Sequence, residues 1–120
     1  MEELSRLHYI VANILELFSY YPHYVMSWGL DPNSIKPIVD DDSNPGIEFT
    51  VSGFKHKGTV HVLYDEGSDT FTFHLLGKTG EIILSKDNLY LDNLVPAIDE
   101  AVEKVENYKE RVMAEYGISH

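Results

Sequence analysis

Four short runs of alternating apolar and polar residues, between Ile47 and Leu84, constrain the fold of this 120-residue chain more than any other feature. The runs read Ile-Glu-Phe-Thr-Val-Ser, Thr-Val-His-Val-Leu-Tyr, Thr-Phe-Thr-Phe-His-Leu and Glu-Ile-Ile-Leu. An alternation of period two, rich in β-branched and aromatic residues, is typical of strands with one buried face. Glycine and charged residues separate the runs, so the sequence predicts a four-stranded antiparallel β-meander.

Two amphipathic segments flank the predicted meander. From Glu2 to Tyr21, apolar residues recur at spacings of three and four, and Pro22 ends the pattern because proline cannot donate the next helical hydrogen bond. A second stripe follows Asn93, the expected N-cap, and runs to Tyr116. Because a sheet with one apolar face needs a cover, we expect a single two-layer α+β domain over residues 1–120, with both long helices on one face.

The predicted turns fix the register of the strands. They place Val62 opposite Phe71 and Phe49 opposite Val62, and a one-residue slip would break both apolar pairings. A short edge strand at residues 35–39 remains an open addition, limited by Pro37. The face that we expect both helices to cover consists of Phe49, Val51, Val60, Val62, Phe71 and Phe73.

The same register gathers hydroxyl and imidazole groups on the opposite face of the sheet. Thr50, His61 and Thr72 are expected in one cross-strand row, with His74 diagonal to His61. Two imidazoles on neighbouring strands are a common metal-site geometry, which makes His61, His74 and Glu48 candidate metal ligands and Thr50 and Thr72 candidate ligand contacts. A simple solvated face is the other interpretation, since antiparallel sheets commonly face water on one side.

The segment from Phe18 to Trp28 is the densest aromatic cluster in the chain. One interpretation is packing across the end of the sheet, and the other is an exposed patch that binds a partner. Tyrosine and tryptophan need partners for their polar atoms when they are buried, so this density favours a partly wet site. The candidate partner-binding residues are Tyr20, Tyr24 and Trp28.

Composition excludes several classes of function. The formal net charge of −11 opposes nucleic-acid phosphates and anionic membranes, and the lack of cysteine excludes thiolate chemistry. The chain has no P-loop, no dinucleotide-binding glycine pattern and no common hydrolase motif, so we expect neither an enzyme nor a cofactor. It opens with Met-Glu-Glu, which is unlike a signal peptide, and no apolar stretch could span a membrane, so we expect a cytoplasmic protein.

A helix, an antiparallel meander and a second helix in a small acidic chain form an element order similar to two known architectures. One is the frataxin family, acidic iron-binding proteins with a helix on each side of an antiparallel sheet. The other is the type III secretion chaperone class, small acidic dimers that hold a partner chain. Both likenesses rest on element order and charge, and no site residue is carried over from either.

These observations lead to two expectations about function. The first is a small, non-enzymatic protein-interaction or adaptor module, whose partner is another protein or a second copy of the chain as a homodimer. The alternative is a small-ligand or metal-binding domain that uses the Thr/Ser/His face of the sheet.

Overall fold

Five antiparallel strands and the helices on one side of them make up the described part of the chain, residues 2–40, 43–53 and 55–102 of the computed structural model. The helices are α1 (Glu2–Ser19), α2 (Pro22–Ser27) and α3 (Leu91–Val102), with a short 3-10 turn η1 (Pro32–Ser34). The strands are β1 (Lys36–Val39), β2 (Pro45–Ser52), β3 (Lys57–Asp65), β4 (Thr70–Leu76) and β5 (Ile82–Leu89). Their order in the sheet is β1-β2-β3-β4-β5, which confirms the predicted α+β class and the meander.

The sheet has five strands, so the prediction of four was wrong by one. The additional strand, β1, is the short edge strand that the sequence left open at residues 35–39, and it pairs with β2 so that Pro37 lies opposite Ile47. Proline has no backbone N–H and so cannot donate a ladder hydrogen bond, and an edge strand tolerates it because only one of its sides is paired.

The predicted pairings are displaced by two residues. Val62 lies opposite Phe73 rather than Phe71, and Phe49 lies opposite Val60 rather than Val62. The turn between β2 and β3 is centred one residue earlier than predicted and the turn between β3 and β4 one residue later, and each such move shifts the pairing by two. Because side chains alternate with period two, a shift of two keeps each of them on its face. The six residues of the predicted covered face are therefore all buried in the core.

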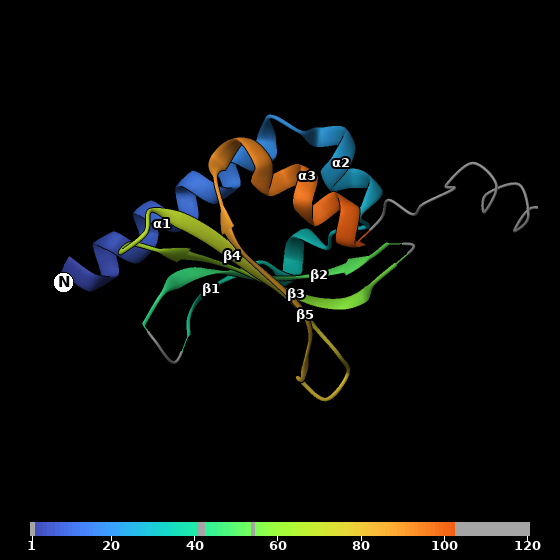
Figure 1. Ribbon diagram of the computed structural model, residues 1–120. Helices are drawn as coiled ribbons and strands as arrows, with labels where there is room; N and C mark the ends of the chain where they lie inside the picture. The colour runs from blue at the N-terminus through green and yellow to red at the C-terminus, as the bar shows by residue number, and fades with distance from the viewer. Residues whose placement is uncertain (1, 41–42, 54, 103–120) are drawn as a thin grey trace, which may run out of the picture.

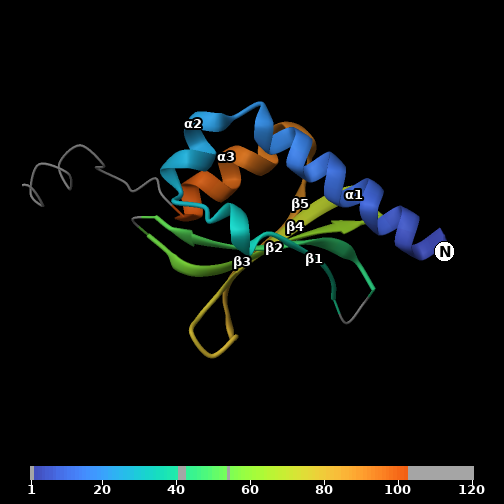
Figure 2. The same cartoon turned by 180° about the vertical axis from the view of Figure 1, so that it is seen from behind.

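The helices lie together on one side of the sheet (Figures 1 and 2). Helix α1 packs on β2 and places Ile10, Ile14 and Phe18, which are spaced four apart, in the same core as the sheet. Helix α3 adds a second buried stripe, formed by Leu94, Val95, Ile98, Ala101 and Val102. The core therefore joins residues from both ends of the described chain to the inner face of the sheet.

Helix α3 begins at Leu91, two residues before the predicted N-cap. Asn93 lies inside the first turn, and its Oδ1 accepts a hydrogen bond from the backbone N–H of Tyr90 at 2.6 Å. Its side chain therefore caps the N-terminus of the helix, as the residue at position N3 does in a capping box. Strand β5 continues to Leu89, beyond Leu84, where the fourth predicted run ends. The predicted continuation of the helix to Tyr116 lies outside the described residues.

Candidate functional site

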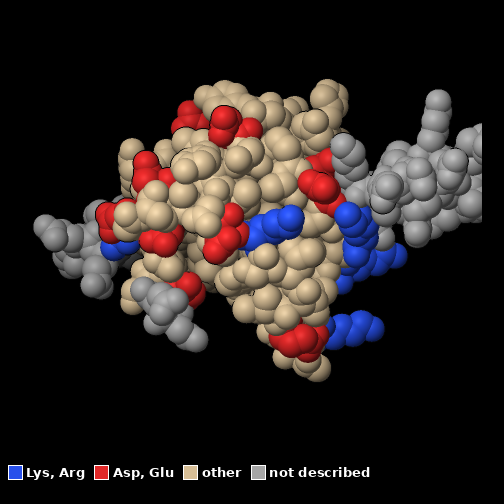
Figure 3. All heavy atoms as spheres, viewed as in Figure 1, with Lys and Arg blue, Asp and Glu red and all other residues tan. Residues whose placement is uncertain are grey.

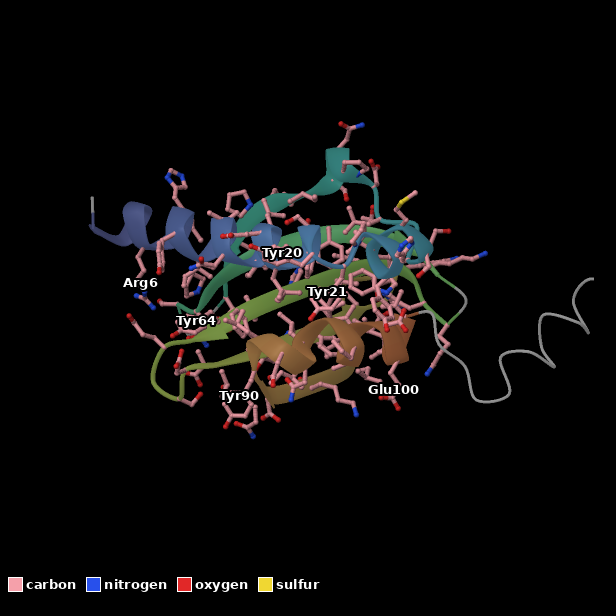
Figure 4. All side chains as sticks on the ribbon, turned by 90° about the horizontal axis from the view of Figure 1, so that it is seen from above. Arg6, Tyr20, Tyr21, Tyr64, Tyr90 and Glu100 are labelled. Atoms are coloured by element: carbon pink, nitrogen blue, oxygen red, sulfur yellow. The ribbon has the colours of Figure 1, made fainter. Side chains whose placement is uncertain are left out.

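A groove of about 680 Å³ lies where α1, the turn between β3 and β4, and the start of α3 meet. Four tyrosines line it, Tyr9, Tyr20, Tyr64 and Tyr90, and we call it the tyrosine groove. Seen from above, Tyr64 lies between α1 and the start of α3, with Tyr20 on the side of α1 and Tyr90 on the side of α3 (Figure 4). Its volume is within the range of small-molecule binding sites.

Three elements position the side chains of the tyrosine groove. Tyr9, Asn13 and Glu16 lie on one face of α1 beside its buried stripe, and Tyr20, four residues after Glu16, directly follows the end of the helix. Tyr64 on β3 lies opposite Phe71 on β4, and the two rings are 5.2 Å apart at an angle of 52°. Residues 90–92, which lead from β5 into α3, close the other side.

The tyrosine groove combines an apolar floor with an acidic rim. Its apolar side chains are Ile10, Leu17, Phe71 and Leu91, and its carboxylates are Glu16, Asp69 and Asp92. Of the described residues that line it, none is Lys, Arg or His. In the space-filling view, acidic side chains gather toward the end at which α1 begins, and most basic ones lie toward the opposite end (Figure 3). A ligand entering the groove therefore meets aromatic rings and negative charge together.

Two tyrosine hydroxyls of the groove donate hydrogen bonds to carboxylates. Tyr20 donates to Glu16 Oε1 at 3.0 Å, and Tyr64 donates to Asp69 Oδ1 at 2.5 Å. The bond to the Asp69 carboxylate, reinforced by burial, raises the pKa of Tyr64 to about 12. The bond to Glu16 likewise raises the pKa of Tyr20. Both hydroxyls therefore stay protonated at neutral pH, which suits them to binding and not to proton abstraction.

The structure separates the three aromatic residues that the sequence proposed as partner-binding. Tyr20 is 68% exposed and lines the groove, whereas Tyr24 is exposed on α2 outside it. Trp28 has no exposed surface: its ring packs edge-on against Phe18, and its indole N–H donates to Asp99 Oδ1 at 3.0 Å. Packing is thus the correct interpretation for Trp28, and Trp28 is not available to a partner.

On the outer face of the sheet, Glu48, His61 and His74 form one cross-strand row. The predicted row of Thr50, His61 and Thr72 was wrong, because the register shift of two moves the two threonines into the rows on either side. The two histidines are directly opposite each other and not diagonal. All five side chains are half-buried.

Hydrogen bonds already occupy the acidic member of this row. Glu48 lies 2.9 Å from His61 Nε2 and 3.0 Å from Lys36 Nζ. Burial alone would raise the pKa of Glu48, but the bonds from Lys36 and His61 outweigh it and lower that pKa. Burial, reinforced by the neighbouring His61, lowers the pKa of His74. Within the described ranges, no three His, Cys, Asp or Glu side chains are arranged to hold a metal ion.

Sequence reasoning found Tyr20 but missed the rest of the tyrosine groove. The helical spacing of Tyr9, Glu16 and Tyr20 was a usable signal, because it marks a polar aromatic face beside the buried stripe. Tyr64 and Asp69 lie at the two ends of the turn between β3 and β4, and the hydrogen bond between their hydroxyl and carboxylate was not predicted. Tyr90 carried no such signal, because its position depends on where β5 ends.

No helix in the described part of the chain is both long and apolar enough to cross a membrane. Comparisons of the chain with protein family models, with curated proteins and with solved structures found no match.

Proposed function

We propose that this protein is a non-enzymatic interaction module that holds a segment of a partner protein in the tyrosine groove. The observation that carries the proposal is the composition of the groove, in which four tyrosines surround an apolar floor. Tyr9, Tyr20 and Tyr90 are each more than half exposed, at 68%, 68% and 57%. Exposed tyrosines are well suited to binding, because each ring offers a large contact area at low entropic cost and carries a hydroxyl for hydrogen bonding.

The proposed occupant is a segment of another protein and not a second copy of this chain. The chain carries a formal net charge of −11, and the rim of the groove adds three carboxylates at the point of contact. A second acidic copy would be repelled from such a surface, whereas a neutral or basic segment would not. The homodimer is therefore the less favoured form of the interaction hypothesis.

A peptide-display selection on the immobilised protein tests the proposal. Selected peptides are compared for binding to wild type, to Asn13→Trp and to Ala12→Trp. Asn13 lines the groove and Ala12 is exposed beside it on the same helix, so only Asn13→Trp fills the groove. We expect the selected peptides to lose binding to Asn13→Trp and to keep it with Ala12→Trp. Peptides that bind both variants as well as wild type would refute the groove as the site.

The outer face of the sheet supports a second candidate function, the binding of a divalent metal ion. The specific observation is that His61 and His74 lie directly opposite each other, where side chains are about 5 Å apart at Cβ, rather than on the longer diagonal. If Zn²⁺ binds there, it should raise the melting temperature of wild type and of His8→Ala, an exposed control on α1, but not of His61→Ala. A shift that survives in His61→Ala excludes this site.

A further inference from the structure

We infer that the residue recognised in the tyrosine groove is a cation, an arginine or lysine flanked by apolar residues in the partner segment. The inference rests on the proposed function and adds the chemical class of the bound side chain. It is carried by charge complementarity, because the groove places carboxylates from three separate elements around one apolar, aromatic space.

The three acidic residues that line the groove come from different parts of the chain. Glu16 comes from α1, Asp69 from the turn between β3 and β4, and Asp92 from the first turn of α3. Arg6, at the start of α1, does not line the groove, and its guanidinium is paired with Glu66 at 2.8 Å. An incoming cation therefore displaces no positive charge from the described residues that line the groove, and the nearby Arg6, whose charge acts on Tyr64, is held by Glu66.

The tyrosine hydroxyls leave acceptor capacity for such a cation. Tyr20 uses one oxygen of Glu16, and Tyr64 uses one oxygen of Asp69. A carboxylate has about four lone-pair positions on its two oxygens, so each can accept further hydrogen bonds from a guanidinium or an ammonium group. The tyrosines hold the two carboxylates in place beforehand, which reduces the entropy lost when a ligand is bound.

The aromatic rings add an attraction of their own. A cation over the face of a tyrosine ring is attracted by the π electrons, and arginine also stacks on the ring and binds carboxylates with two parallel hydrogen bonds. Leu17 and Leu91 line the same groove and would contact the apolar neighbours of the cation. We therefore expect arginine to bind more tightly than lysine, and both more tightly than a neutral side chain.

Fluorescence anisotropy with matched peptides tests the inference. The probe is fluorescein-labelled Gly-Leu-Arg-Leu-Arg-Leu-Gly, compared with peptides in which both arginines are replaced by lysine or by citrulline, the neutral isostere of arginine. We expect the affinity to fall from arginine to lysine to citrulline and to fall with added salt, since surface charge pairs are screened. Equal affinity for the arginine and citrulline peptides would overturn the inference and leave the proposed function standing.

Variants that each remove one negative charge, inside or outside the groove, show whether the carboxylates of the groove bind the arginine peptide. Asp69→Asn removes a carboxylate, and asparagine tolerates the positive φ of 54° at this position. We expect Asp69→Asn and Asp92→Asn each to lower the affinity for the arginine peptide about fivefold, which is the factor for one charge pair at about 4 Å in water. Glu81→Gln makes the same change in net charge in the loop before β5, outside the groove, and should leave the affinity within about a factor of two.

Two further results would overturn the inference. One is a loss of affinity in Glu81→Gln as large as in Asp69→Asn, which would mean that net charge alone attracts the peptide. The other is the absence of any binding of the arginine peptide to wild type. Far-ultraviolet circular dichroism of each variant establishes that the fold is intact, and the display selection above judges the proposed function separately.

Discussion

Replacing Trp28 by phenylalanine should destabilise the protein by about 3 kcal/mol. Trp28 is fully buried and donates its indole N–H to Asp99 Oδ1 at 3.0 Å, and Asp99 is itself only 9% exposed. Phenylalanine removes this donor and leaves a buried carboxylate without it, which costs about 2 kcal/mol for a charged acceptor. The smaller ring adds a packing loss of about 1 kcal/mol. For a chain of this length the melting temperature should fall by about 10 °C.

Urea unfolding followed by circular dichroism measures the effect, because the variant has lost the sole tryptophan of the chain. The second variant, Trp28→Phe with Asp99→Leu, removes both polar partners. It should regain most of the stability lost with the hydrogen bond, since an apolar pair leaves no buried polar group unsatisfied. Tyr24→Phe, on the exposed part of α2, should stay within about 0.5 kcal/mol of wild type. If Trp28→Phe were as stable as wild type, Trp28 would not be a core residue, and the exposed aromatic patch would have to be reconsidered.

Two further predictions concern titration. Burial and the neighbouring His61 lower the pKa of His74 in the folded state, and the opposite effect of Asp40 is smaller. Protonation of His74 therefore favours the unfolded state. Stability should therefore fall as the pH drops below about 6.5, and His74→Gln should reduce that fall in urea melts compared at pH 5.5 and 7.5; an unchanged pH dependence would contradict the assignment. In alkaline titrations followed at 295 nm, wild type should show a tyrosine with a pKa of about 12 that is missing in Tyr64→Phe and lowered in Asp69→Asn. If the tyrosine lost in Tyr64→Phe were instead one that titrates near the ordinary pKa of 10, with the step near 12 unchanged, the hydrogen bond would be excluded.

Side-chain periodicity was enough to predict which residues form the core, but not which residues are neighbours. Phe49, Val60 and Phe73 were placed on the correct face because the alternation of apolar and polar residues decides the face. Their partners across the sheet depend on where each turn is centred, and a turn moved by one residue shifts every pairing by two while keeping the same pattern of faces. This is why the core was predicted correctly while the pairing was displaced by two residues.

The candidate site was harder to predict for the same reason. The tyrosine groove joins Tyr20, Tyr64 and Tyr90, which are far apart in the sequence and meet only once the helix has been laid on the sheet. An aromatic cluster in sequence pointed instead to Trp28, whose indole N–H is satisfied by Asp99, a residue 71 positions away. A local pattern cannot reveal such a distant partner, so it could not distinguish a buried tryptophan from an exposed one.

Nuclear magnetic resonance mapping of the arginine peptide tests the central hypothesis most directly. The side-chain signals of Tyr9, Tyr20, Tyr64 and Tyr90 should shift together and saturate as the peptide is added, because these rings form the walls of the groove. The ring signals of His61, on the opposite face of the sheet, should stay unchanged and serve as the internal control. Saturable shifts confined to the tyrosines are the predicted result. Shifts at His61, or a peptide that binds without moving the tyrosine signals, would contradict the assignment of the groove as the binding site.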